Sequence, residues 1–167
     1  MEETNSSGVA VARYSEGPNV DEPLAMLRSG ATSYYQSDAL GSVTSLSNAA
    51  GALAQTYTFD SFGKQTASSG SLINPFQYTG REFDTETGLY FYRARYLDAS
   101  TGRFLSEDPL KFDAGNNFYD YVGNNPVEFV DPSGLQAGCA RRKALRRIWV
   151  PQVPVLHLGL LPLILMP

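Results

Sequence analysis

The chain has 167 residues, a formal net charge of −4 and a hydrophobic content of 43%. This length fits one domain or a piece of one, and the charge does not predict a nucleic-acid-binding surface over the main body. A single histidine, His157, and a single cysteine, Cys139, argue against a histidine triad, a zinc site or an internal disulfide, and we expect no metal or other cofactor. Ten tyrosines, nine phenylalanines and fifteen glycines favour strands and turns.

The first 30 residues are weakly patterned, and we interpret them as the remnant of a repeat. Val9, Val11 and Tyr14 alternate as they would in a short strand. The start of the chain has neither the basic region nor the apolar region of a signal peptide. We therefore expect either a protein that is at first cytoplasmic or a chain that begins in mid-repeat, and the pattern favours the second.

An internal repeat follows. Tyr35-x-x-Asp38-x-x-Gly41 recurs as Tyr57-x-x-Asp60-x-x-Gly63, displaced by 22 positions. Residues 43–46 and 54–59 favour strands, and residues 48–51 read as the turn between them. The pattern predicts β-hairpin units, which need neighbouring units to bury their apolar faces.

An aromatic-rich block comes next. Residues 84–88 and 98–102 are near copies of an Asp-x-x-Thr-Gly turn. Between them we predict a hairpin-forming strand with alternating faces. One face carries Leu89, Phe91, Arg93, Arg95 and Leu97, and the other carries Tyr90, Tyr92, Ala94 and Tyr96. If the first face is covered, its arginines need acidic partners, and the candidates nearby are Glu82, Asp84 and Glu86.

Two Asp-Pro dipeptides in this block, Asp108-Pro109 and Asp131-Pro132, allow two interpretations. Two carboxyl groups held close together share a proton, so that one can activate water while the other protonates a carbonyl oxygen. Asp and Pro also favour turns, and from the spacing alone we favour the interpretation that both dipeptides are only turns. A short strand is predicted over 127–130, directly before the second dipeptide.

The composition changes sharply between Leu135 and Gln136. Residues 138–149 are basic and are compatible with one or two helical turns, and an apolar tail interrupted by four prolines follows. This tail is too short and too broken for a transmembrane helix. For the basic run 141–147 we favour a solvated segment or linker over a nucleic-acid-binding or membrane-active peptide.

The stretches GREFDTETGLYFYRARYLDASTGRFLSEDP and YVGNNPVEFVDPSGL resemble the core domain associated with RHS and YD repeats. The YxxDxxG units resemble the YD repeats themselves, and together the resemblance covers roughly residues 9–135. It implies an all-β fold in which β-hairpin repeats spiral into a hollow cage and the core domain plugs one end. The expected divisions are an N-terminal repeat remnant, YD/RHS repeats, the core domain and a variable C-terminal tail, at residues 1–30, 31–74, 75–135 and 136–167.

The resemblance also implies a function. It predicts the end segment of a toxin shell that encloses a C-terminal effector and cleaves itself after the DPSGL motif, between Leu135 and Gln136. On matching positions, Asp108 and Asp131 are the expected catalytic pair of an aspartyl-protease-like site acting in cis, and Arg95 assists. The alternative is a non-enzymatic structural or cell-surface YD-repeat fragment.

Members of this family serve in interbacterial competition or in insecticidal toxin complexes. The resemblance therefore implies a protein made in the cytoplasm and then secreted, or displayed on the cell surface, through a specialised secretion system. The expected partners are the upstream repeats of a longer shell, the chain's own C-terminal segment, the secretion machinery and an immunity protein.

Overall fold

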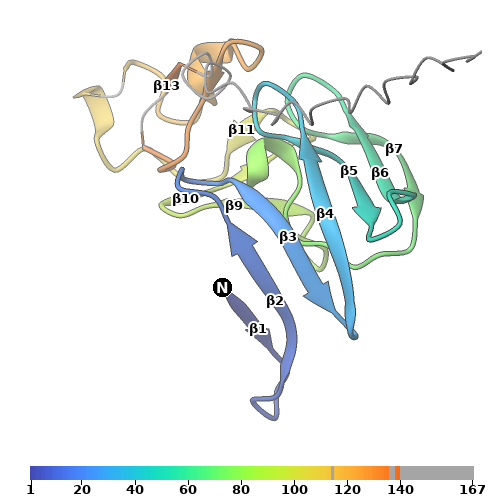
Figure 1. Cartoon of the computed structure of the whole chain (residues 1–167). Helices are drawn as coiled ribbons and strands as arrows, with labels where there is room; N and C mark the ends of the chain where they lie inside the picture. Colours follow the sequence, from blue (N-terminus) through green and yellow to red (C-terminus); the bar gives the residue numbers. More distant parts are fainter. Residues whose placement is uncertain (114, 136–137, 140–167) are drawn as a thin grey trace, which may run out of the picture.

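The computed structural model describes residues 1–113, 115–135 and 138–139, and it is built almost entirely of strands and turns (Figure 1). Seven strands form one antiparallel sheet in which each strand pairs with the next along the chain. This arrangement confirms the predicted all-β fold of successive hairpins. The strands are β1 (Glu2–Thr4), β2 (Ala10–Glu16), β3 (Pro23–Arg28), β4 (Ala31–Ser37), β5 (Val43–Asn48), β6 (Leu53–Phe59) and β7 (Gln65–Gly70).

The repeated Asp-x-x-Gly units form the same turn twice. Asp38 Oδ1 accepts hydrogen bonds from the amides two and four residues later, at 2.9 and 2.8 Å, and Asp60 Oδ1 does the same at 2.9 and 3.0 Å. Gly41 and Gly63 have φ values of 86° and 89°, a left-handed conformation that glycine adopts without strain. The repeat in the sequence is therefore a repeat of one turn, placed between β4 and β5 and again between β6 and β7.

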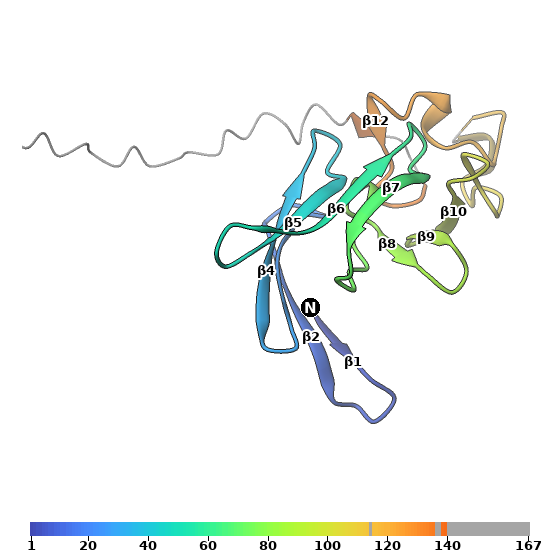
Figure 2. The same ribbon diagram turned by 90° about the vertical axis from the view of Figure 1, so that its right-hand side faces the viewer.

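A second, smaller antiparallel sheet has the strand order β11-β10-β9-β8. Figure 2 shows its strands beside the seven-stranded sheet, while the β1–β2 hairpin extends away from the rest. Short 3-10 helices and one further strand pair complete the described fold. The remaining elements are η1 (Tyr78–Gly80), β8 (Glu82–Asp84), β9 (Leu89–Tyr92), β10 (Arg95–Asp98), β11 (Arg103–Phe104), η2 (Lys111–Asp113), η3 (Val122–Asn124), β12 (Phe129–Val130) and β13 (Gly138–Cys139).

The alternation predicted along residues 89–97 is broken by a tight turn. Arg93 has a φ of 59°, so the chain reverses at Arg93 and Ala94, and Tyr92 pairs with Arg95 across the resulting hairpin. β9 and β10 are therefore two paired strands instead of one continuous strand. A non-glycine residue in the left-handed region is uncommon, and no glycine or asparagine in the sequence marks this turn.

This turn changes which side chains share a face. Residues that pair directly across two strands lie on the same side of a sheet. Arg95 and Leu97 therefore lie with Tyr90 on the buried side, while Tyr96 pairs with Phe91 and is exposed. The prediction that the two arginines share a face with Phe91, and that Tyr96 joins the other tyrosines, is wrong for this reason.

The structure also differs from two predictions near the C-terminal end. The strand expected over 127–130 is limited to β12. Gly138 and Cys139 lie within the segment for which one or two helical turns were considered, but they form β13, which pairs with β12. The rest of residues 138–149 lies outside the part that the structure describes.

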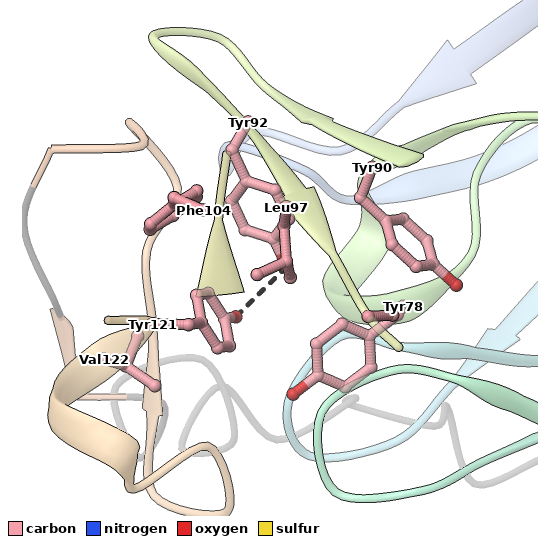
Figure 3. Close-up of a cluster of buried hydrophobic side chains, with 8 residues drawn as sticks. Tyr78, Tyr90, Tyr92, Leu97, Phe104, Tyr121 and Val122 are labelled. Carbon is pink, nitrogen blue, oxygen red and sulfur yellow. Dashed lines mark hydrogen bonds between the residues drawn. The ribbon is translucent and has the colours of Figure 1, made fainter. Parts of the chain in front are cut away.

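Two clusters of buried side chains hold the sheets together. One lies against the seven-stranded sheet and the other fills the smaller unit (Figure 3). Phe59 packs against both clusters and so connects them. The first cluster contains Ala12, Tyr14, Met26, Val43, Leu46, Tyr57 and Phe76, and the second contains Tyr78, Tyr90, Tyr92, Leu97, Ala99, Phe104, Tyr121 and Val122.

Buried hydroxyl groups in the second cluster bind one another. The Tyr92 hydroxyl lies 2.7 Å from Thr79 Oγ1 and 3.1 Å from the Tyr121 hydroxyl, the latter contact drawn as a dashed line in Figure 3. The Tyr92 and Tyr121 rings meet nearly edge to face, with centroids 5.4 Å apart. Such pairing avoids the cost of burying an unsatisfied hydroxyl. Among the described residues, no helix is long and apolar enough to span a membrane.

Candidate functional site

The three residues predicted to be catalytic lie together. Arg95 Nη2 is 2.8 Å from Asp108 Oδ2 and 3.5 Å from Asp131 Oδ2. The three side chains are buried, with exposed fractions of 3%, 5% and 2% in the same order. Arg95 begins β10, Asp108 follows β11 and Asp131 follows β12, so three separate strands bring these groups to one point.

Arg95 is the centre of this site. Its Nε donates to the Gly134 carbonyl at 2.5 Å and its Nη1 donates to the Phe118 carbonyl at 3.1 Å. Burial lowers the pKa of the Arg95 guanidinium, and the Asp108 and Asp131 carboxylates act in the opposite direction. An arginine remains charged under such conditions, so it supplies a fixed positive charge between two acids.

Asp131 also organises the DPSGL turn. Its Oδ1 accepts hydrogen bonds from the amides of Ser133, Gly134 and Leu135 at 3.2, 2.9 and 3.2 Å, and from the Ser133 hydroxyl at 3.1 Å. Aspartate commonly binds the backbone that follows it, and Gly134 has a φ of 73° that suits glycine. The turn therefore occupies one carboxylate oxygen, while the other faces Arg95.

Asp108 also uses one carboxylate oxygen in a local turn and the other at Arg95. Its Oδ1 accepts a hydrogen bond from the Leu110 amide at 2.8 Å, and its own amide donates to the Phe118 carbonyl at 2.9 Å. Its Oδ2 is the atom that meets Arg95. Each aspartate thus forms a local turn and, with its other oxygen, contributes to the shared site, so the two interpretations of the Asp-Pro dipeptides are physically compatible.

Residues 93–95 hold three successive carbonyl groups of the DPSGL turn. The Arg93 side chain donates to the first, the Ala94 amide to the second and the Arg95 side chain to the third. A Cβ atom on Gly134 would lie 2.1 Å from the Tyr92 carbonyl oxygen, so the turn packs tightly on the end of β9. The three accepting carbonyls belong to Pro132, Ser133 and Gly134.

The acidic partners expected near the two arginines are not the ones found. Arg93 Nη2 binds Asp21 Oδ1 at 2.8 Å, and Arg95 binds Asp108 and Asp131, so the candidates Glu82, Asp84 and Glu86 are wrong. Sequence reasoning did not single out Asp21. It lies in the weakly patterned first segment, and no local signal identifies it as a partner of a residue 72 positions away.

A pocket of about 510 Å³ opens beside the paired aspartates. Polar residues contribute much of its wall, and Leu135, the first residue of the predicted cleavage site, also lines it. Gln136, the second, lies outside the described residues. Among those that are described, no group of three or more His, Cys, Asp or Glu side chains is arranged to hold a metal ion. The polar lining includes Arg95, Asp108, Asp113, Asn117, Asp120 and Asp131.

Successive hairpins that lead into an aromatic-rich block with a buried Arg-Asp-Asp cluster define an all-β repeat protein. The profile of the Teneurin YD-shell family matches residues 21–127. The chain therefore belongs to the Teneurin YD-shell family, in agreement with the resemblance to RHS and YD repeats.

The chain is similar to segments of bacterial toxins. It is 34% identical over 139 residues to the tRNA3(Ser)-specific nuclease WapA of Bacillus spizizenii, covering 79% of this chain and 6% of that protein. It is 30% identical over 126 residues to double-stranded DNA deaminase toxin A of Burkholderia cenocepacia, covering 72% of this chain and 9% of that protein.

A solved structure shares the fold. The crystal structure of TcdB2-TccC3-TEV matches with a TM-score of 0.67 and 25% identity, covering 79% of this chain and 7% of that one. In each of these three comparisons the chain spans less than a tenth of the other protein's length. The similarity therefore concerns one shell segment of much longer proteins.

Proposed function

We propose that this segment closes one end of an RHS/YD toxin shell around a C-terminal effector and cleaves its own chain between Leu135 and Gln136. The observation that carries the proposal is the contact of one arginine nitrogen, Arg95 Nη2, with Oδ2 of both Asp108 and Asp131. The two relatives described above bear the names of different activities and yet both match this segment. That pattern supports a common shell which accompanies different effectors.

In the proposed reaction, one aspartate acts as a carboxylate and takes a proton from a water molecule. The water oxygen attacks the Leu135 carbonyl carbon while the second aspartate, as a carboxylic acid, protonates the carbonyl oxygen. The C–N bond then breaks, the Gln136 nitrogen receives the proton held by the first aspartate, and the second recovers its own. The pocket beside the pair gives the water room.

Arg95 has a positional part in this scheme. Its bond to the Gly134 carbonyl fixes the peptide unit directly before Leu135, and its contacts with the two carboxylates fix the acids relative to that unit. A reacting peptide in the same chain needs no separate binding step, because it is present at a high effective concentration. The domain divisions at residues 75–135 and 136–167 follow from this proposal, as plug and variable segment.

The wider biology belongs to the same proposal. The upstream repeats of a longer shell and the chain's own C-terminal segment are its first partners. Export through a specialised secretion system, action in interbacterial competition and recognition by an immunity protein follow if the enclosed segment is a toxin.

The test is the intact mass of the purified 167-residue chain. We expect the wild type to lose residues 136–167, and Asp108→Asn and Asp131→Asn to remain whole. Asp113→Asn is the matched control, because Asp113 lines the same pocket and lies in η2 instead of at the arginine contact. If the wild type is folded by circular dichroism and its mass shows no cleavage, the proposed self-cleavage is ruled out. If the wild type is unfolded, the same masses are measured on a protein that includes upstream repeats.

A second candidate function is a non-enzymatic structural or cell-surface fragment. The observation that favours it is the use of Oδ1 of Asp108 and Asp131 in their own turns, which a purely structural residue also requires. In that case Asp131→Asn lowers stability, and the wild type and the variant both keep their full mass.

A further inference from the structure

Arg93 connects the DPSGL turn to the seven-stranded sheet. Its Nη1 donates to the Pro132 carbonyl, and its Nη2 donates to Asp21 Oδ1 at 2.8 Å. Asp21 lies in the loop between β2 and β3, at the edge of the pocket that also includes Arg93. One side chain therefore touches both the repeat sheet and the turn that carries the predicted cleavage site.

Asp21 is a rigid anchor for this contact. Its side chain is only 6% exposed, and its Oδ1 also accepts a bond from Arg81 Nη1 at 2.5 Å. Arg81 in turn donates twice to the Phe91 carbonyl in β9, at 2.9 and 2.6 Å. A Cβ atom on Gly80 would lie 2.5 Å from the Asp21 carbonyl oxygen, so the backbone of the loop is also closely packed.

Arg93 itself is the movable member, since 46% of its side chain is exposed. An exposed arginine with no anchor has many rotamers, and holding it in one of them costs conformational entropy. The buried Asp21 carboxylate removes that freedom by binding both terminal nitrogens of the guanidinium, Nη2 through Oδ1 at 2.8 Å and Nη1 through Oδ2 at 3.4 Å. The contacts therefore run from the loop of the seven-stranded sheet that carries Asp21, through Arg93, to the DPSGL turn.

We propose that Arg93 is a positioning residue for the cleavage turn and that Asp21 orients it, so the turn adopts its reactive geometry when the repeat sheet is docked against the core. The inference rests on the proposed self-cleavage. Arg95 fixes the turn at Gly134, and Arg93 fixes it two residues earlier at Pro132. Two points of attachment define the direction of the peptide, and small errors in that direction slow a reaction strongly.

The first experiment compares cleavage rates of the 167-residue chain by intact mass over time. Arg93→Met keeps the length of the side chain and removes its donors, and we expect cleavage to slow by about tenfold or more. Arg13→Met is the matched control, because Arg13 is also exposed and binds one carboxylate, Glu2, at 2.7 Å within the sheet. Equal rates for the two variants would overturn the proposal.

The second experiment tests whether Asp21 acts through Arg93. Asp21→Asn keeps an acceptor for Arg81 and removes the charge that holds Arg93. If the two residues act as one unit, the double variant cleaves no more slowly than the slower single variant. Independent slowing, in which the two effects multiply, would contradict the proposed order of contacts.

The third experiment does not depend on cleavage. In an Asp108→Asn background, which we expect to keep the chain whole, hydrogen exchange is measured at the amides of residues 133–135. We expect Arg93→Met to speed their exchange and leave β5 unchanged, since β5 is paired on both sides in the main sheet. If the wild type never cleaves, the proposed function fails, and this exchange still decides whether Arg93 holds the turn: unchanged exchange rejects it.

Discussion

The guanidinium carbon of Arg95 lies 3.7 Å from the centroid of the Phe104 ring. Phe104 belongs to the second buried cluster, so one flat face of the guanidinium packs against the core while its edges bind carboxylates and carbonyls. A cation on an aromatic face is held most strongly where water is excluded. The candidate site is therefore an extension of the core, and changes in either affect the other.

Arg95→Lys is expected to damage both stability and cleavage. A lysine ammonium is a point donor, and it cannot stack on Phe104 and reach Gly134, Phe118 and both aspartates at once. We expect the free energy of unfolding to fall by about 2 kcal/mol, the cost of buried acceptors left unsatisfied. Urea denaturation measures this change, and intact mass measures the expected loss of self-cleavage.

The control for this variant is Arg103→Lys, at an exposed position of β11. Surface changes of this kind usually stay within roughly 0.5 kcal/mol. Equal effects of the two substitutions on urea denaturation would mean that the planar guanidinium of Arg95 has no special role.

Gly134→Ala is expected to open the DPSGL turn. The substitution adds a Cβ atom 2.1 Å from the Tyr92 carbonyl oxygen, and Gly134 also has a φ of 73°. Gly88→Ala separates these two causes, because Gly88 has a φ of 74° and a Cβ atom there meets nothing within 4 Å. The left-handed conformation alone costs an alanine about 1–2 kcal/mol.

We therefore expect Gly134→Ala to lower the free energy of unfolding by clearly more than Gly88→Ala, and to stop cleavage where Gly88→Ala does not. Urea denaturation and intact mass provide the two readouts. Similar losses at both positions would indicate that the turn can move away from β9 at little cost.

The stability of the protein is expected to fall above pH 10. Burial, and next the hydrogen bond to Glu3, raise the pKa of Tyr14 from 10.0 to about 12. Below pH 10 both the folded and the unfolded chain keep this proton. Between pH 10 and about 12 the unfolded chain loses it first, so the free energy of unfolding decreases by up to about 1.4 kcal/mol per pH unit for one such tyrosine.

Other buried or partly buried tyrosines act in the same direction. Burial also raises the pKa values of Tyr35, Tyr78, Tyr90, Tyr92 and Tyr121. Urea denaturation at several pH values between 8 and 12 measures the combined slope, and Tyr14→Phe is expected to make it shallower. Tyr34→Phe, which removes a tyrosine at an exposed position, is the control. Parallel curves for the wild type and Tyr14→Phe would contradict the assignment to Tyr14.

The hairpin repeats were predictable because their signals are local. In both copies the aspartate and the glycine that form the turn are separated by three positions, and the hydrogen bonds that they make are the same. The faces of residues 89–97 were predicted wrongly because the chain reverses at Arg93 in a left-handed conformation, which an arginine rarely adopts and which its residue type does not predict.

The candidate site required information of another kind. Spacing alone left Asp108 and Asp131 as ordinary turns, and the resemblance to a known family supplied their pairing with Arg95. The link from Arg93 to Asp21 spans 72 positions and is formed by the packing of one sheet on another. Contacts of that kind follow from the tertiary fold, and no local pattern in the sequence records them.

The pairing of β12 with β13 has a consequence for what a cut would achieve. β12 precedes the DPSGL turn and β13 follows it, so the strands on either side of the Leu135–Gln136 bond pair with each other. Hydrolysis of that bond would therefore leave β13 paired with β12 in a nicked protein. Since a two-residue ladder is weak by itself, the severed end can peel away while the seven-stranded sheet stays intact.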